Sequence, residues 1–89
     1  GDVVAVAKRD LKVGEMLDGE GGYTVWGKLV PAQRSISLGG LPIGLAHRMA
    51  LRRPVARGQI VTWEDVAIDQ QDSAVAFRRQ MEQVFQALN

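Results

Sequence analysis

The distribution of apolar residues along the chain predicts a series of short strands followed by one helix. Segment 3–7, VVAVA, is small or β-branched throughout and predicts a short strand buried on both faces. Segment 23–30 also has strand character, with a bend or bulge expected at Gly27. Segment 18–22 is glycine-rich and is expected to be a loop, as is segment 32–40 at the surface.

The longest apolar stretch is segment 43–51. Propensity also permits a helix over 45–52, but Gly44 before it and Pro54 behind it favour a strand. In a strand, His47 lies on the face that we predict to point inward. The other residues of that face are Ile43, Leu45, Met49 and Leu51.

Segment 62–65, TWED, is typical of a capped turn. Thr62 is the predicted N-cap, and Asp65 stands three residues on, where Glu or Gln is usual in a capping box. The turn is expected to be short, because 66–68 has strand character again and 69–71 is a polar linker.

Two stretches of the chain repeat each other 44 residues apart. KRDLKVGEMLD at 8–18 aligns with RRPVARGQIVT at 52–62, so that Gly14 matches Gly58. The apolar positions align as well: Leu11 with Val55, Met16 with Ile60 and Leu17 with Val61.

Each copy of the repeat predicts the same local structure. An apolar residue enters the core, and the chain then turns sharply at a glycine, which tolerates positive φ without steric cost. A short strand leaves the turn, at 15–17 in the first copy and 59–61 in the second. We therefore expect two related strand–turn–strand units built around one core.

Segment 74–88 is predicted to be a helix, with Asp72 or Ser73 as its cap. Its apolar residues recur at spacings of three and four: Ala74, Phe77, Met81, Val84, Phe85 and Leu88. This pattern predicts an amphipathic helix roughly 22 Å long. We expect Phe77, Met81 and Phe85 to be buried against the β core or a neighbouring chain, or else to await a part of a larger parent protein.

Length and composition narrow the class of protein. Eighty-nine residues make one domain, and 46% hydrophobic with 24% charged residues is ordinary for a folded chain. A net charge of +1 argues against nucleic-acid binding, and no apolar run approaches the roughly 20 residues of a membrane helix. Since there is no cysteine, disulfides and thiolate metal sites are excluded, which fits a cytoplasmic protein. The start at Gly1, without methionine, suggests a piece of a longer protein.

Three segments carry a resemblance to a known family. AKRDLKVGEML at 7–17 resembles the opening signature of SAF domains, small β-clip modules of sialic acid synthases, sugar-acid dehydratases and pilus or flagellar assembly chaperones. RRPVARGQIVTWEDV at 52–66 is similar to the closing half of that module. Segment 23–47, with WGKLVPA and LPIGLAH, resembles the C-terminal SAF-like domain of homoserine-dehydrogenase-like oxidoreductases, a group that includes deoxyxylulose-phosphate-reductoisomerase-like enzymes.

The resemblance implies a mainly β fold, with an SAF-like β-clip domain at 1–70 and a C-terminal amphipathic helix at 71–89 appended to it. It implies a non-catalytic part of a larger NAD(P)-dependent oxidoreductase that assists substrate binding or oligomer contacts. NAD(P) would then bind an upstream nucleotide-binding domain of the parent, and neither a cofactor nor activity is expected in this chain alone. The alternatives are a carbohydrate- or sugar-acid-binding module and a pilus or flagellar assembly chaperone domain.

Candidate site residues are few. His47 is the only histidine, and a structural role outweighs a catalytic one, because no catalytic serine or cysteine partner is evident. Arg9 in the first unit and Arg52 and Arg53 in the second occupy matching places. They can converge to bind an anionic substrate group, since arginine pairs well with carboxylate and phosphate, or they can decorate a solvated edge. We predict Arg9, Arg52, Arg53 and His47 as substrate-binding candidates, with no catalytic or metal-binding residue.

Two further patterns favour structural roles. The glycines of 18–22 do not open a helix, as a dinucleotide fingerprint requires, and Asp18 with Glu20 falls short of a calcium ligand set. Trp26 and Trp63 could stack on a sugar, but in a small core tryptophan is more often a packing anchor.

Overall fold

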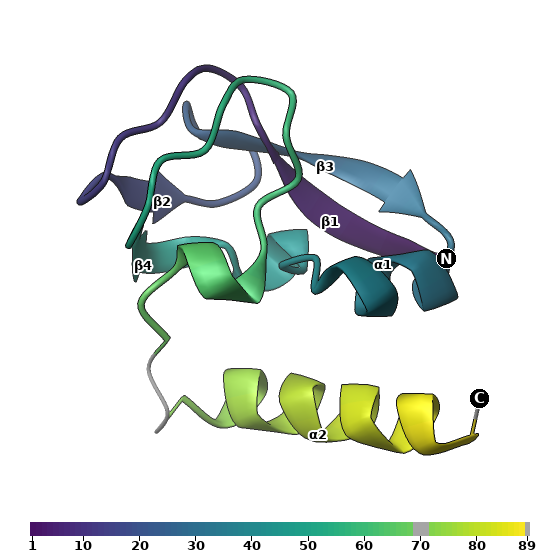
Figure 1. Cartoon of the computed structure of the whole chain (residues 1–89). Coiled ribbons are helices and arrows are strands. Elements are labelled where there is room, and N and C mark those ends of the chain that lie inside the picture. The colour runs from purple at the N-terminus through teal and green to yellow at the C-terminus, as the bar shows by residue number, and fades with distance from the viewer. Residues whose placement is uncertain (69–71, 89) are drawn as a thin grey trace.

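The computed structural model of the chain describes residues 1–68 and 72–88. The predicted linker at 69–71 lies outside the described residues, and so does the predicted boundary between residues 70 and 71. Within the described part, two antiparallel pairs of strands combine with short helical turns and a C-terminal helix (Figure 1). The fold is therefore a small mixed structure in which the strands form the body.

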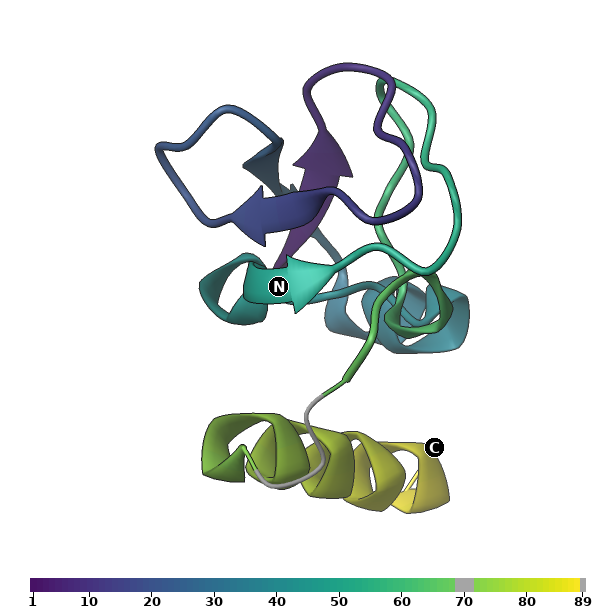
Figure 2. The same ribbon diagram turned by 90° about the vertical axis from the view of Figure 1, so that its left-hand side faces the viewer.

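Both strand pairs join segments that are distant in the sequence. Strand β1 (Asp2–Ala7) pairs with β3 (Val25–Val30), and β2 (Met16–Asp18) pairs with β4 (His47–Ala50). In Figure 2, β2 and β4 are at the front and β1 passes behind them. The expected strands at 3–7, 15–17 and 23–30 are thus present with bounds shifted by one or two residues.

The core lies between the strands and is filled by small and branched aliphatic side chains from both halves of the chain. The largest of the fully buried ones are Val4, Val6, Leu11, Leu17, Val25, Leu41, Val61 and Val66. Strand β1 is buried from Val4 to Ala7, as its composition predicts, whereas Val3 is exposed.

The two repeated units meet at Leu11 and Val55. These residues exchange both backbone hydrogen bonds: the N–H of Leu11 donates to Val55 at 2.8 Å, and the N–H of Val55 donates back at 3.1 Å. Since they are also the aligned residues of the repeat, a pseudo-two-fold axis passes between them.

The hydrogen bonds on either side of this axis come in matched pairs. Gly14 donates its N–H to Leu51 at 2.8 Å, and Gly58 donates to Ala7, the residue equivalent to Leu51, at 2.9 Å. Two further pairs of bonds match. The N–H of Leu51 donates to Glu15 as that of Ala7 donates to Gln59, and the N–H of Glu15 donates to Lys12 as that of Gln59 donates to Ala56. Both glycines have positive φ, 89° for Gly14 and 82° for Gly58, so the turn prediction is confirmed.

Even the side chains beside the two turns correspond. The carboxylate of Glu15 accepts the N–H of Lys12 at 2.6 Å, and the amide oxygen of Gln59 accepts the N–H of Ala56 at 3.0 Å. The segments that leave the turns pair alike, because Met16 lies opposite Ala50 in the first unit and Ile60 opposite Val6 in the second. The strand expected at 59–61 is reduced to that single bridge at Ile60. The sequence repeat is therefore a structural repeat.

The expected surface loop at 32–40 is wrong, because the segment contains helix α1 (Ala32–Leu38). The helix follows Pro31 and ends at Gly39, which has φ 70° and donates its N–H to Ile36 at 3.1 Å. A left-handed glycine of this kind is a common helix C-cap, so the glycine that suggested a loop instead ends a helix.

The expected continuous strand at 43–51 is also only partly correct. A 3₁₀ turn η1 (Ile43–Leu45) comes first, and β4 follows. The pairing of β2 with β4 holds one extra residue on β4, and Arg48 there has φ 57°. Such a bulge breaks the alternation of side chains, so His47 lies exposed rather than on the inward face that we predicted.

The capped turn is present as η2 (Trp63–Asp65). The carboxylate of Asp65 accepts the backbone N–H of Thr62 at 2.8 Å and its hydroxyl at 3.0 Å, which confirms the capping box. The strand expected at 66–68 is reduced to a single bridge between Val66 and Leu51.

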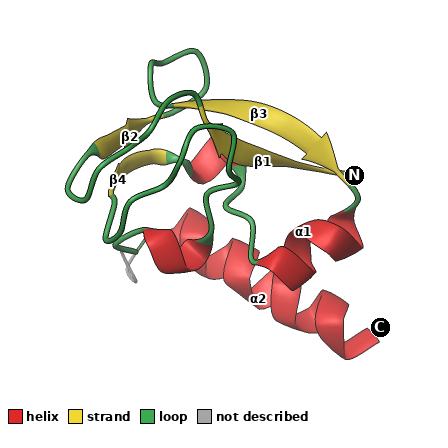
Figure 3. Cartoon of the chain, turned by 45° about the horizontal axis from the view of Figure 1, so that its top comes forward, coloured by secondary structure: helices red, strands yellow, loops and turns green. Residues whose placement is uncertain are grey.

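Helix α2 (Ser73–Leu88) agrees with the predicted helix in extent, and Asp72 caps it by accepting the N–H of Ala74 at 2.9 Å. Both helices lie on the same side of the strands (Figure 3). Of the arrangements expected for the apolar residues of α2, packing on the β core is wrong for Phe77 and Met81, which are 64% and 49% exposed, while Phe85 is half-buried. The buried residues of α2 are Val75 and Glu82 instead.

Replacing Gly58 with alanine should lower the free energy of unfolding by about 1–2 kcal/mol, because a Cβ at positive φ strains the backbone. There is open space around Cα, so no clash contributes. Gly44→Ala is the matched control: a Cβ there also meets open space, but φ is not in the left-handed region. Urea denaturation would contradict this account if both variants lost the same stability.

Candidate functional site

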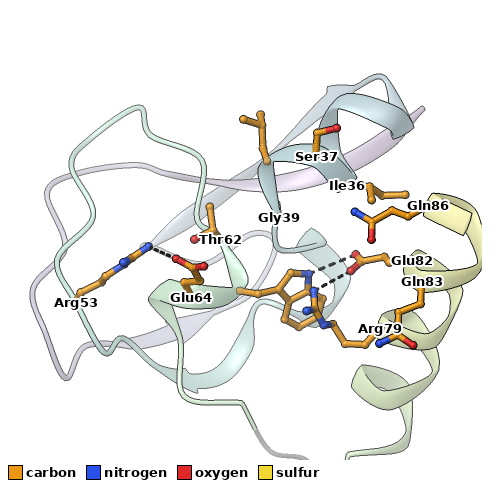
Figure 4. Close-up of a pocket in the computed structure, with 12 residues that line it drawn as sticks. Ile36, Ser37, Gly39, Arg53, Thr62, Glu64, Arg79, Glu82, Gln83 and Gln86 are labelled. Atoms are coloured by element: carbon orange, nitrogen blue, oxygen red, sulfur yellow. Dashed lines mark hydrogen bonds and ion pairs between the residues drawn. The ribbon is translucent and has the colours of Figure 1, made fainter. Parts of the chain in front are cut away.

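A polar pocket of about 360 Å³ lies where the C-terminal end of α1, the turn η2 and the middle and C-terminal turns of α2 meet (Figure 4). Its walls carry hydroxyl, amide, guanidinium and carboxylate groups from four parts of the chain: these three elements and Arg53. We call it the polar pocket and define it by its lining: Ile36, Ser37, Leu38, Gly39, Arg53, Thr62, Trp63, Glu64, Arg79, Glu82, Gln83 and Gln86.

The inner wall of the polar pocket is built around Glu82. Its carboxylate accepts a hydrogen bond from the indole N–H of Trp63 at 3.3 Å and one from the guanidinium of Arg79 at 2.9 Å. Arg79 also lies over the indole ring, 4.9 Å from its centroid, which is a cation–π contact. Trp63 is 5% exposed, so it acts as the packing anchor that its residue type favours.

Behind this wall, an ion-pair network joins α2 to the body. Arg78 donates its Nε–H to Glu82 at 2.8 Å and uses its other nitrogens on the carboxylate of Asp2. The hydroxyl of Ser35, which is fully buried, also donates to Asp2, at 2.6 Å. We call these residues, together with Trp63, the Glu82 network.

The network shifts the pKa values of its members. The hydrogen bond from Arg78 lowers the pKa of Asp2 below its ordinary value, and the hydrogen bond from Ser35 acts in the same direction. The hydrogen bond with Asp2 raises the pKa of Arg78. Both residues are therefore charged at neutral pH, and the helix is held to the strands by an ion pair that water reaches only in part.

Arg53 lies at the mouth of the polar pocket, opposite α2. Its guanidinium pairs with Glu64 at 3.2 Å and with Asp65, the acidic residue of the capping box. A guanidinium has five N–H donors, and these described contacts use two of them. Arg53 can therefore contact a ligand without leaving its partners.

The other predicted site residues lie elsewhere. Arg9 pairs with Glu15 of its own unit at 2.7 Å, whereas the matching Arg53 pairs with Asp65 of η2, just beyond the second copy. The backbone N–H of Arg52 donates to Asp65 at 2.7 Å, but neither Arg52 nor His47 is among the residues that line the polar pocket.

Sequence reasoning missed the contribution of α2 to the site. Arg79, Glu82 and Gln83 fall outside the apolar stripe of the predicted helix and were not among the candidate site residues. A usable signal was the spacing of Arg78 and Arg79 from Glu82, four and three residues, which permits ion pairs along a helix.

The glycine-rich loop after β2 closes on Asp18. Its carboxylate accepts the N–H of Tyr23 at 2.7 Å and that of Thr24 at 3.0 Å, as well as the hydroxyl of Thr24. These bonds, above all the one from the Thr24 hydroxyl, lower the pKa of Asp18 to about 2. The carboxylate is thus engaged in shaping the loop.

The described residues hold neither a metal-binding cluster nor a membrane-spanning helix. No cluster of three or more histidine, cysteine, aspartate or glutamate side chains is placed to hold a metal ion in segments 1–68 and 72–88. In the same part of the chain, neither helix has the length and hydrophobicity needed to cross a bilayer.

Comparison with known proteins does not place the chain. No protein-family model matches the sequence, and no curated protein is significantly similar to it. The chemistry of the polar pocket must therefore be argued from its residues. It offers charged donors and acceptors in nearly equal number, with amides and hydroxyls between them, which suits a small ligand that carries a carboxylate and several hydroxyls.

Asp2→Asn should destabilise the protein by about 1–3 kcal/mol at pH 7, because it removes the partner charge of Arg78. Since folding lowers the pKa of Asp2, this stabilisation is complete above about pH 4 and is lost as the pH falls through the lowered value. The difference in unfolding free energy between wild type and variant should therefore shrink towards about pH 2.

The control is Glu20→Gln, which removes an exposed loop carboxylate that makes no hydrogen bond or ion pair with a described residue. Its effect should be small at every pH. Thermal unfolding that showed the same pH dependence for both variants would contradict the assigned role of Asp2.

Proposed function

We propose that the chain is an SAF-like β-clip domain that works as an accessory, non-catalytic part of a larger NAD(P)-dependent oxidoreductase. The observation that supports this best is the pseudo-two-fold exchange of hydrogen bonds between the two strand–turn–strand units. The units that exchange these bonds are the segments whose sequences resemble the opening and closing halves of the module. In this proposal, NAD(P) binds an upstream domain of a cytoplasmic parent enzyme.

The polar pocket gives this domain its part in substrate binding. Arg53, which is paired with η2, and Arg79 of α2 both line the pocket. Charge-assisted hydrogen bonds from a guanidinium are well suited to a carboxylate or phosphate. Gln83 and Gln86 add amide donors and acceptors from the same helix. The domain would therefore hold the polar, anionic end of a small substrate while the parent's other domain carries out hydride transfer.

A second candidate is a carbohydrate- or sugar-acid-binding module that acts without a nucleotide-binding partner. The balance of donors and acceptors in the polar pocket favours it, because hydroxyl-rich ligands use both. The two candidates differ in the protein that carries the domain, and the reading frame upstream separates them. A strand, a G-x-G-x-x-G turn and a helix encoded there support the oxidoreductase, and an upstream frame without that unit supports the binding module. A secretory signal there supports the third alternative, the assembly chaperone.

In the full-length parent, Arg53→Ala should raise the KM for an anionic substrate about tenfold and change kcat little, as loss of one charge-assisted hydrogen bond predicts. Arg9→Ala is the matched control. It removes the pseudo-equivalent arginine, which is equally exposed (51% against 52%) and also paired with a glutamate, but lies outside the pocket. Steady-state kinetics with equal KM values for both variants would remove Arg53 from the site.

The chain itself should show no saturable binding of NADPH at micromolar concentration. The reason is that its glycine-rich loop precedes a strand, and therefore lacks the aligned N–H groups of a helix N-terminus that hold a pyrophosphate. Isothermal titration with NADPH measures this directly. A micromolar Kd would mean that this domain, rather than an upstream one, binds the cofactor.

A further inference from the structure

Helix α2 presents a regular apolar stripe to solvent. We call this stripe the helix seam and define it by five residues: Ala74, Phe77, Met81, Val84 and Leu88. Val84 and Leu88 are 56% and 81% exposed, and Phe77 and Met81 are comparably open. A contiguous apolar surface of this kind is uncommon on a monomer and marks a docking site.

The spacing along the helix seam indicates what kind of surface covers it. Its residues are separated by three, four, three and four positions, which is the a and d pattern of two successive heptads. This 3.5-residue period places a narrow apolar line along one side of a helix, and a second helix running alongside fits it best. The partner element is therefore an α-helix.

Charge along the borders of the helix seam favours a second copy of α2. The neighbouring positions on one border are Ser73, Gln80 and Ala87, which carry no charge. On the other border, Arg78 is already neutralised by Asp2 and Glu82. Two copies can thus approach without repulsion between like charges, which usually sets the partner choice of paired helices.

We propose that the protein forms a two-fold symmetric dimer in which the helix seams of two copies pack antiparallel, centred on Met81. In this register, Met81 meets Met81 of the second copy, and the Phe77 end of one seam faces the Val84 end of the other. Antiparallel packing also sets the helix dipoles in opposite directions. A groove of about 640 Å³ between the seam and α1, lined in part by Ala32 and Ile36, gives the second helix room to settle.

The size of the exposed surface agrees with a modest but specific dimer. Burying the open parts of the seam residues in both copies removes on the order of 1,000 Å² from water, the lower end for specific interfaces. From such an area we expect a dissociation constant of the dimer in the micromolar range. The proposal depends only on α2 and holds whether or not the parent is an oxidoreductase.

Sedimentation equilibrium tests whether the chain forms this dimer. The wild-type chain should behave as a dimer above micromolar concentration, and Met81→Glu should weaken dimerisation, raising the dissociation constant by about a hundredfold or more, because it buries two like charges at the centre of the seam. Gln83→Glu is the control: it adds the same charge to the same helix on a face turned away from the seam, and it should remain dimeric. Circular dichroism checks that both variants keep the wild-type helix content.

A cysteine trap gives a second test that does not depend on a destabilising charge. The chain has no cysteine, so Met81→Cys creates a single thiol that should form an intermolecular disulfide on mild oxidation. Gln83→Cys should stay monomeric on a denaturing gel. A wild-type monomer up to about 1 mM, or equal cross-linking of the two variants, would overturn the proposal and leave the seam to a helix of a different protein. Neither outcome bears on the NADPH or KM measurements, so failure of the dimer is distinct from failure of the proposed function.

Discussion

The orientation of α2 depends on the polar groups that the body presents beneath it. Asp2, Ser35 and the indole N–H of Trp63 all lie where the helix docks, and an apolar face placed on them would leave buried polar groups without partners. Arg78 and Glu82 satisfy these groups, so the charged side of α2 turns inward. The apolar seam is consequently left outside, although its composition alone would place it in the core.

The repeat shows how much two short segments can determine. Leu11 and Val55 exchange hydrogen bonds at the pseudo-two-fold axis, and each is followed by a glycine whose N–H reaches the other unit. The bonds between the copies therefore support the conformation of both. This reciprocity gives a small chain a single core without disulfides, and it leaves the two outer ends, where Arg9 and Arg53 lie, free to diverge.

Strands β1, β2 and β3, both glycine turns, the capping box and the extent of α2 could be predicted, because each depends on local chemistry: β-branched residues, positive φ, a short acidic side chain, or an N-cap. Helix α1 could not, since seven residues give little periodicity and Gly39 suits a loop as well as a C-cap. The exposed position of His47 arises from a bulge in the pairing of β2 with β4, which is a property of two strands together. Of the predicted site residues, Arg53 lines the polar pocket, but most of the other residues that line it come from α1 and α2, far apart in sequence.

Helix α2 serves both proposals with opposite faces. Its charged side supplies Arg79 and Glu82 to the polar pocket, while its apolar side forms the helix seam. Because both depend on how the Glu82 network seats the helix, a ligand that contacts Arg79 and Glu82 would hold α2 more firmly against the body. A firmly seated helix presents its seam in one fixed position, and pre-organisation of that kind lowers the entropic cost of pairing. Ligand binding and dimer formation are thus expected to reinforce each other, provided that the network stays intact.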